Sequence, residues 1–572
     1  MVQSFIDLQC EMNCVGIVPY PGVSARLPGP STVACRIEQN TRVSQSRADR
    51  QECACTGLPR ENMNDTMRAA SSKEPAQGKF LEPAMDLALL ISSLSRQDGA
   101  TTHSQQEALY RSLRDMLLDG HLPPGTRLAS TRVLAAELGI ARNSAVYAYE
   151  RLAEEGFVAA TRNGTITLWD GCSRPSAGHG NSPAPVHLSA RVHGLENTDP
   201  EPERMLPFVP GLPSLDEFPV AQWRRCIERA WKTITPARLA YGPVEGLPEL
   251  RRAVAAYIRV SRGVRCDTGQ VFITDGTQSS LELCARMLAN PGDYGWLENP
   301  CYNGAKTAFR STGLNPVPIE VDREGMAPTD EQWRTRPPRL IYTTPSHQYP
   351  LGALMSPRRR AALVERARAC GAWIIEDDYD SEFRHGGQPL PAIQGLHADA
   401  PVCYLGTFSK TMFPALRLGF MVVPPVLVEH FTRTLRELVH RGHSADQLAM
   451  AEFIDSGLFA RHLRKMRALY AARRSSLETA LARHLGTSLS VRESPGGMHL
   501  SADLAVPLRD TDVARAASAH GLLLQPLSHY CIGDGRRYNG FVLGYSGLSD
   551  ATIETAAMQF ADVIDRQRRA RR

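Results

Sequence analysis

A lysine, an aspartate and an arginine each follow a short apolar run in this sequence, and their side chains are suited to covalent chemistry. Lys410 comes shortly after a run that ends near Leu405, and Asp377 directly follows Glu376 at the end of another run. Arg417 lies seven residues beyond Lys410. A lysine amine forms Schiff bases with aldehydes, and a carboxylate can keep a ring nitrogen protonated. An arginine fork binds phosphate through two hydrogen bonds.

Two further segments supply the remaining parts of such a site. Thr274-Asp275-Gly276-Thr277-Gln278 joins an apolar run to a helical pattern, so its backbone N–H groups and the helix dipole face an anion. Tyr302 follows Glu298-Asn299-Pro300 and can stack on an aromatic ring. Amine, carboxylate, anion cup and ring contact together are what pyridoxal 5′-phosphate requires. Each residue alone has a simpler interpretation as a surface, capping or packing residue, but their order favours the cofactor, with Lys410 as the catalytic residue.

These residues must be positioned by an α/β domain. Short β-type runs alternate with long helical ones, which predicts a mainly parallel sheet whose ligands bind beyond the carboxyl ends of the strands. The predicted strands are Val271–Thr274, Arg339–Thr344, Trp373–Ile375, Val402–Leu405 and Gly419–Val423, with helices such as Arg358–Cys370 between them.

A separate helical region precedes this domain. Its spacing predicts a helix from Gln105 to about Gly120, a second from the cap Ser130 to Gly139, and a third from Arg142 to Gly156. A hairpin follows, because two strand-like pieces (157–161 and 165–168) flank an Asn-Gly dipeptide.

The arrangement of these helices predicts a winged helix-turn-helix that binds DNA. Arg142, Asn143 and Ser144 open the third helix, where side chains reach base edges and phosphates. Arg132 begins the second helix, and Arg162 lies at the hairpin tip. Residues 104–168 hold seven arginines and seven acidic residues, so bulk charge does not favour DNA. A small protein-interaction module is the alternative.

The motifs of this region resemble a known family. Gly120-His121-Leu122-Pro123-Pro124-Gly125-Thr126-Arg127 and Leu138-Gly139-Ile140-Ala141-Arg142-Asn143-Ser144 are similar to the N-terminal domain of GntR-type bacterial regulators. The resemblance implies that Arg132 and Arg142 contact DNA, with Asn143 and Ser144 beside them. Ala141 departs from the family, which usually has a capping serine there, and losing such a cap costs about 1 kcal/mol of helix stability.

Residues 206 to about 560 resemble fold-type I aminotransferases. Three motifs resemble the MocR-type regulators in particular: Thr344-Pro345-Ser346-His347-Gln348-Tyr349-Pro350, Glu376-Asp377-Asp378-Tyr379-Asp380-Ser381-Glu382-Phe383 and Gly406-Thr407-Phe408-Ser409-Lys410. The resemblance implies that Lys410 forms the Schiff base, Asp377 pairs with the pyridinium nitrogen and Tyr379 contacts the phenolic oxygen. It also implies a set that holds the phosphate, with Tyr302 on the ring: Thr277, Gln278, Thr407 and Arg417.

Together these features predict an α/β aminotransferase-like body with large and small domains, preceded by a small winged helix-turn-helix domain. The expected divisions are an extension, disordered or from a start assigned too far upstream (1–84), the DNA-binding domain (85–168), a Pro-rich linker (169–205) and the cofactor-binding body (206–572).

Three functions fit this organisation. The first is a transcriptional regulator whose body senses pyridoxal phosphate or an amine or amino acid that reacts with it. The second is an active aminotransferase with an appended DNA-binding head, and the third a DNA-binding protein with a vestigial body. Aminotransferases of this type keep an arginine for the substrate carboxylate near the last strands, and Tyr538–Gly544 has none, although Arg536 and Arg537 are close. Transamination is therefore less expected than sensing.

Composition adds only broad limits. The formal net charge is +5 over 572 residues, which is too weak to identify a nucleic-acid partner. The thirteen cysteines are too few for a disulfide scaffold, and Cys53-Ala54-Cys55 lacks zinc-site spacing, so we expect no metal. Without a signal peptide or an apolar run long enough for a bilayer, the sequence predicts a cytoplasmic protein. Fold-type I bodies resemble dimers, so we expect a homodimer on a two-part double-stranded DNA operator.

Overall fold

The computed structural model describes residues 105–162, 164–168, 189, 191–192, 206–385, 390–439 and 442–571, with the side chain of Arg536 excepted. The predicted N-terminal extension, the Cys53–Cys55 pair, Asn163 and most of the predicted linker lie outside these ranges. The chain divides into two compact units between residues 180 and 181, a position inside the segment predicted as a linker. None of the helices in the described ranges has both the length and the apolar composition that a membrane span requires.

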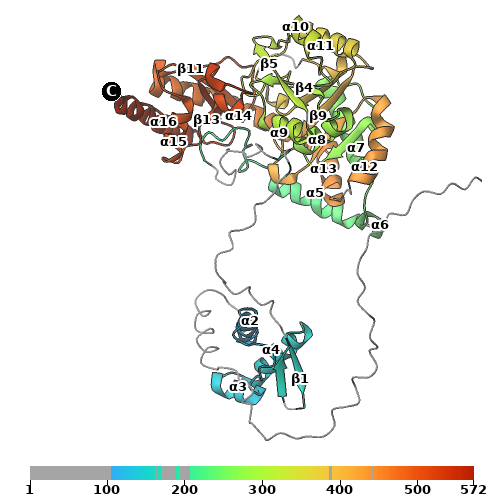
Figure 1. Cartoon of the computed structure of the whole chain (residues 1–572), viewed down its shortest axis with the longest axis vertical. Coiled ribbons are helices and arrows are strands. Elements are labelled where there is room, and N and C mark those ends of the chain that lie inside the picture. Colours follow the sequence, from blue (N-terminus) through green and yellow to red (C-terminus); the bar gives the residue numbers. More distant parts are fainter. Residues whose placement is uncertain are drawn as a thin grey trace, which may run out of the picture. The chain divides into compact units, whose positions relative to one another are not determined.

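The first unit contains three helices and a hairpin, drawn in blue and cyan in Figure 1. Ser130 caps the second helix by accepting a hydrogen bond from the Val133 N–H, and Gly139 ends it in the left-handed conformation (φ 64°), as the sequence predicts. The observed elements are α2 (Gln105–Leu118), α3 (Thr131–Leu138), α4 (Arg142–Glu154), β1 (Val158–Thr161) and β2 (Gly164–Thr167), and β1 and β2 are antiparallel.

The core of this head is small and is filled by leucine and alanine. Leu113, Leu134 and Leu152 are fully buried, and Ala145 and Ala148 let α4 pack closely against its neighbours. Val133 is 49% exposed, because the buried stripe of this short helix holds only Leu134 and Ala135. The absence of a side-chain cap at α4 is confirmed, since Ala141 makes no such hydrogen bond.

An eight-stranded sheet forms the centre of the second unit. Its strand order is β3-β10-β9-β8-β7-β4-β5-β6, and the pairs from β5 through β9 are parallel, as predicted. Only β10 and the short edge strand β6 run against their neighbours. The strands are β3 (Val271–Thr274), β4 (Tyr294–Asn299), β5 (Asn315–Asp322), β6 (Gly325–Met326), β7 (Leu340–Thr343), β8 (Trp373–Asp378), β9 (Val402–Thr407) and β10 (Gly419–Val422).

Helices surround this sheet, and a second, antiparallel sheet lies beside it. Figure 1 shows the red C-terminal elements gathered at one side of the green and yellow sheet. The second sheet has the order β11-β12-β14-β13, with β11 (Leu489–Val491), β12 (His499–Leu504), β13 (Gln525–Pro526) and β14 (Gly540–Gly544). The helices are α5 (Val220–Lys232), α6 (Pro236–Leu239), α7 (Pro248–Arg262), α8 (Thr277–Leu288), α9 (Asn303–Ser311), α10 (Asp330–Thr335), α11 (Pro357–Cys370), α12 (Val428–Leu438), α13 (Ser444–Asp455), α14 (Leu458–Leu485), α15 (Asp510–Ser518) and α16 (Asp550–Ala570).

The topology brings distant parts of the chain to one edge of the large sheet. The carboxyl ends of β3, β4, β7, β8 and β9 meet there, because these strands run in the same direction. The antiparallel β10 begins at the same edge, since Gly419 pairs with Thr274 and with Thr407. Residues that follow the first strands and precede the last one are therefore neighbours.

Candidate cofactor site and DNA-binding head

One cavity of about 290 Å³ lies at this edge. All eight residues predicted to hold the cofactor line it: Thr277, Gln278, Tyr302, Asp377, Tyr379, Thr407, Lys410 and Arg417. The sequence reasoning had not singled out the other residues of the lining: Pro210, Gly211, Tyr342, Tyr349, Ser409, Pro414 and His499. The fold thus assembles in one place residues that are up to 289 positions apart, from Pro210 to His499.

Asp377 offers a buried oxygen with no partner. Its Oδ2 accepts a hydrogen bond from the Tyr342 hydroxyl at 2.9 Å, while its Oδ1 is buried and has no hydrogen-bond partner among the described residues. Burial raises the pKa of this carboxyl from 3.8 to about 7. A cationic N–H of a ligand would satisfy Oδ1 and restore the charged form, which is the chemistry that a pyridinium nitrogen supplies.

Lys410 points into the same cavity from the segment after β9. Its Nζ donates to the Gly211 carbonyl at 2.9 Å, and burial lowers the pKa of the amine. A Cβ at position 211 would lie only 2.7 Å from Nζ, and the backbone of Gly211 has a positive φ of 72°. Glycine is suited to this position because it has no Cβ to meet the lysine and adopts positive φ without strain. A lysine whose pKa is lowered carries a larger fraction of the neutral amine that attacks carbonyl carbon.

An anion cup is formed by the start of α8 and by Arg417. Gly276 precedes the helix with φ 101°, and a Cβ built there would lie 3.6 Å from the guanidinium of Arg417. Arg417 itself adopts the left-handed conformation (φ 51°), which costs a non-glycine residue on the order of 1 kcal/mol. The first N–H groups of the helix and the guanidinium therefore face the same point, as phosphate binding requires.

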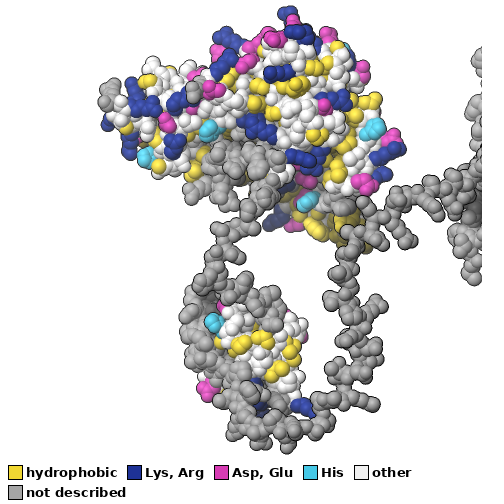
Figure 2. Space-filling view, viewed as in Figure 1, with side chains coloured by type: hydrophobic (Ala, Val, Ile, Leu, Met, Phe, Trp, Pro, Cys, Tyr) yellow, Lys and Arg dark blue, Asp and Glu magenta, His cyan; other side chains and the backbone are white. Residues whose placement is uncertain are grey.

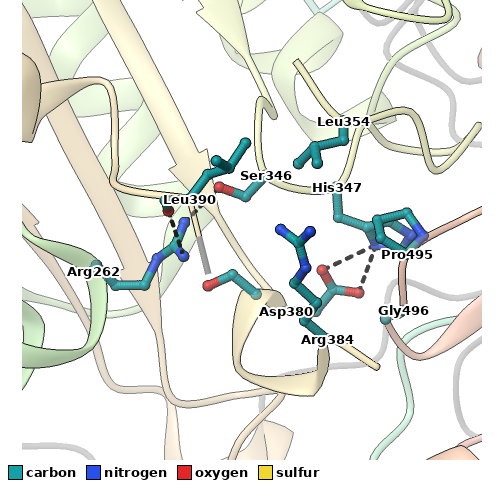
Figure 3. Close-up of a pocket in the computed structure, with 11 residues that line it drawn as sticks. Arg262, Ser346, His347, Leu354, Asp380, Arg384, Leu390, Pro495 and Gly496 are labelled. Carbon is teal, nitrogen blue, oxygen red and sulfur yellow. Dashed lines mark hydrogen bonds and ion pairs between the residues drawn. The ribbon is translucent and has the colours of Figure 1, made fainter. Parts of the chain in front are cut away.

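Tyr379 is held by a histidine that the sequence reasoning missed. Its hydroxyl lies 2.9 Å from Nδ1 of His347 and donates to the His347 carbonyl at 3.0 Å. Nδ1 also lies 2.9 and 3.0 Å from the two carboxylate oxygens of Asp380, which Figure 3 shows turned toward the imidazole ring. Gly497 permits this packing, because a Cβ there would lie 2.1 Å from the His347 ring. His347 and Asp380 thus fix the position of Tyr379 at the cavity.

Aromatic rings line the part of the cavity around Tyr302. The ring of Tyr302 lies edge-on to Tyr349 at 6.0 Å, and Tyr349 lies edge-on to Tyr379 at 5.7 Å. The Tyr349 hydroxyl donates to that of Tyr530 at 3.2 Å. These rings offer apolar faces and edges against which an aromatic ring can pack. The sequence motifs contain tyrosines at 302, 349 and 379. Roles were predicted only for Tyr302 and Tyr379, so Tyr349 was the residue that the motifs could also have indicated.

In the head, four of the five predicted DNA-contacting residues lie at exposed positions. Arg132, Arg142, Asn143 and Arg162 are exposed, and Ser144 is half-buried in the first turn of α4. Arg127 was missed. Its guanidinium would lie 3.3 Å from a Cβ at Gly164, so it packs beside the start of β2 next to the hairpin tip.

The two parts of the chain match two family models. Residues 105–167 match the bacterial regulatory proteins of the gntR family, and residues 212–557 match aminotransferase class I and II. The multiple substrate aminotransferase of Thermococcus profundus has a similar structure, with a TM-score of 0.59 at 25% identity over 67% of this chain and 97% of its own. LysN, the alpha-aminoadipate aminotransferase of Thermus thermophilus, has a TM-score of 0.58 at 28% identity over 63% of this chain and 92% of its own.

The fold and the matches define a GntR-type helix-turn-helix head joined to a body with the fold of class I and II aminotransferases, a family known to depend on pyridoxal phosphate. The probable rhizopine catabolism regulatory protein MocR of Rhizobium meliloti is 40% identical over 80% of this chain and 93% of its own length. The pyridoxine biosynthesis transcriptional regulator PdxR of Corynebacterium glutamicum is 30% identical over 80% of this chain and 95% of its own. The chain belongs to the MocR-type transcriptional regulators of the GntR family.

Proposed function

We propose that the body of this regulator binds pyridoxal 5′-phosphate through Lys410 and uses it to sense a small amine or amino acid. The single observation that carries the proposal is the unpartnered Oδ1 of Asp377, which is buried in the same cavity as Lys410 and Arg417. A buried polar oxygen without a partner costs stability, so its presence in a ligand cavity points to a ligand donor. The relatives are named as regulators, which does not favour the aminotransferase alternative.

Each residue has a distinct role in this proposal. Lys410 would hold the cofactor through its aldehyde carbon, and Asp377 would accept a hydrogen bond from the ring N–H. The start of α8, with Thr277, and the side chains of Thr407 and Arg417 bind the phosphate. The remaining lining residues act on the ring: Tyr302 packs on it, Tyr379 binds its phenolic oxygen, and Gln278 closes the wall beside Gly304.

An effector amine would exchange with Lys410 at the aldehyde carbon. Bound pyridoxal phosphate would supply the aldehyde carbon for which the effector amine and the Lys410 amine compete. The lysine is then free to change its contacts, beginning with the Gly211 carbonyl that accepts from it in the present structure. A conformational change follows only if the effector binds two arrangements of the body with different affinity.

We also infer that two copies of the chain assemble through the α5–α6 region. Several large apolar side chains are exposed there, and Figure 2 shows apolar surface at this lower edge of the body. They are Val220 (64% exposed), Trp231 (57%), Leu239 (68%) and Tyr241 (79%). Exposed apolar side chains grouped in this way mark a protein interface. Two heads per dimer would read the two halves of a double-stranded operator.

The head would bind DNA through Arg132, Arg142, Asn143, Ser144 and the hairpin Arg162. Replacing Arg142 by alanine is expected to weaken binding of the full-length protein to an upstream DNA duplex by about tenfold or more, because it removes a charged contact at the start of the recognition helix. A gel-shift titration at fixed salt measures this change.

Arg358→Ala provides the matched control, because this arginine is exposed on α11 in the body. It removes the same charge and should leave the affinity unchanged. Equal losses of DNA affinity in the two variants would mean that net charge alone drives DNA binding. No loss of affinity in either variant would contradict the assignment of α4 as the helix that reads the DNA.

A further inference from the structure

We propose that the effector of this cavity is a small amine that carries a second hydrogen-bond donor, such as a hydroxyl, and no carboxylate, and that Nδ1 of His499 accepts from that donor. This inference rests on the proposed cofactor function, and it names a specificity-determining residue and the chemical class of the ligand.

The hydrogen bonds of His499 define which of its nitrogens carries a proton. Nε2 lies 3.1 Å from the Pro350 carbonyl oxygen, which can only accept, so Nε2 carries the hydrogen. The Ser501 hydroxyl donates to the same carbonyl. Burial, with a contribution from the neighbouring His347, lowers the pKa of His499 to about 3, so the ring is neutral near pH 7. In the neutral ring with hydrogen on Nε2, Nδ1 is an acceptor with a free lone pair.

This lone pair is left without a partner. His499 is only 1% exposed, and Nδ1 has no hydrogen-bond partner among the residues that the structure describes. The ring also lines the cavity that contains Lys410, and it lies 5.2 Å from the ring of Tyr349. A ligand with a hydrogen-bond donor would satisfy Nδ1, whereas a purely apolar ligand would leave Nδ1 without a hydrogen bond.

The residues of β14 that lie opposite His499 and Ser501 in the described part of the chain carry no charge. On the pairing of β12 with β14, Gly544 lies opposite His499 and Val542 lies opposite Ser501. Directly opposed residues share a face, so the face of His499 carries glycine and valine on β14. Val542 is fully buried in an apolar cluster with Leu351.

The cations of the described lining have other roles. Lys410 is the proposed covalent residue, and Arg417 lies at the phosphate cup beside Gly276. Arg537 pairs with Glu320 and lines a different cavity together with Arg492. A carboxylate placed near His499 would therefore meet the Nδ1 lone pair and, among the described lining residues, no cation left to pair with it, so it would lose hydration without gaining an ion pair.

The test compares three ligands on the full-length protein loaded with pyridoxal phosphate. The probes are 2-aminoethanol, n-propylamine, which has a methyl group in place of the hydroxyl, and β-alanine, which carries a carboxylate. The apparent Kd of each is measured from the change in the visible absorbance band. We expect 2-aminoethanol to bind about tenfold more tightly than n-propylamine, and β-alanine to bind more weakly than both.

Two variants separate specificity from folding. His499→Phe keeps an aromatic ring and should keep the absorbance band while abolishing the preference for 2-aminoethanol over n-propylamine. His430→Phe, at an exposed position on α12, is the matched control and should leave all three affinities unchanged.

The outcomes distinguish this inference from the cofactor proposal. If β-alanine binds unmodified protein as tightly as 2-aminoethanol, or if His499→Phe retains the preference, the amine class assigned here is wrong while the cofactor proposal stands. If the unmodified protein shows no lysine-dependent band after loading, the proposed function is overturned and this inference with it.

Discussion

Replacing Lys410 by alanine is expected to abolish the visible absorbance that the full-length protein acquires with pyridoxal phosphate. Nζ of Lys410 lies in the cavity beside Gly211, and no other lysine is part of the described lining. Without this amine the aldehyde has no covalent partner there, and only the weaker contacts of the phosphate cup and the ring remain. Spectra recorded before and after desalting measure both the band and the retention of the cofactor.

Lys465→Ala is the control for this experiment. Lys465 is 59% exposed and pairs with Glu217 at the surface, where such pairs contribute little. The control should retain the band and the wild-type melting temperature. Persistence of the band in the Lys410 variant, with the control unchanged, would contradict the assignment of Lys410.

Replacing Asp377 by asparagine is expected to stabilise the cofactor-free protein at pH 8 and to weaken its cofactor binding. The pKa of the folded-state carboxyl is about 7, above its usual 3.8, because of burial. A group with a raised folded-state pKa contributes its full stability below the unfolded-state pKa and loses it as the pH rises through the folded-state value. Between about pH 4 and pH 7 the wild type therefore loses stability that the asparagine variant retains, up to about 4 kcal/mol.

Urea unfolding of both cofactor-free proteins at pH 5 and pH 8 measures this difference, which should be larger at pH 8. Asp399→Asn is the control, since Asp399 is 84% exposed and its replacement should have little effect at either pH. A stability difference between wild type and Asp377→Asn that stays constant with pH would show that the Asp377 carboxyl is not responsible. Cofactor affinity should fall in Asp377→Asn, because the amide offers no charge to a pyridinium.

Local sequence rules predicted the elements whose ends carry caps or glycine. Ser130 and Gly139 delimit α3 at the predicted residues, and β3 has the predicted bounds. The strand β5 was missed because it contains Pro316 and Pro318, which lack the N–H that a strand usually donates. The strands β11, β12 and β13 of the second sheet were also missed, since their pairing is defined by distant partners rather than by local pattern.

The cavity residues also divide into those that local sequence patterns could predict and those that depend on contacts between distant segments. Asp377 lies at the end of β8, Lys410 follows β9 and Arg417 precedes the antiparallel β10, so the strand directions bring them to one edge, and the sequence could predict their proximity to strand ends. His347 and His499 are 152 positions apart, and their rings meet at 5.0 Å only through the packing of the second sheet against the first. The free acceptor of His499 depends on the Pro350 carbonyl, a contact that the sequence pattern does not show.

The most direct test of the account is the affinity of the full-length protein for its upstream DNA, measured with and without pyridoxal phosphate at one salt concentration. If the body senses the cofactor or an amine bound to it, the two affinities should differ by about fivefold or more, and Lys410→Ala should show no such difference. Equal affinities for the loaded and cofactor-free wild type, with 2-aminoethanol also without effect, would contradict the claim that the cavity controls the head.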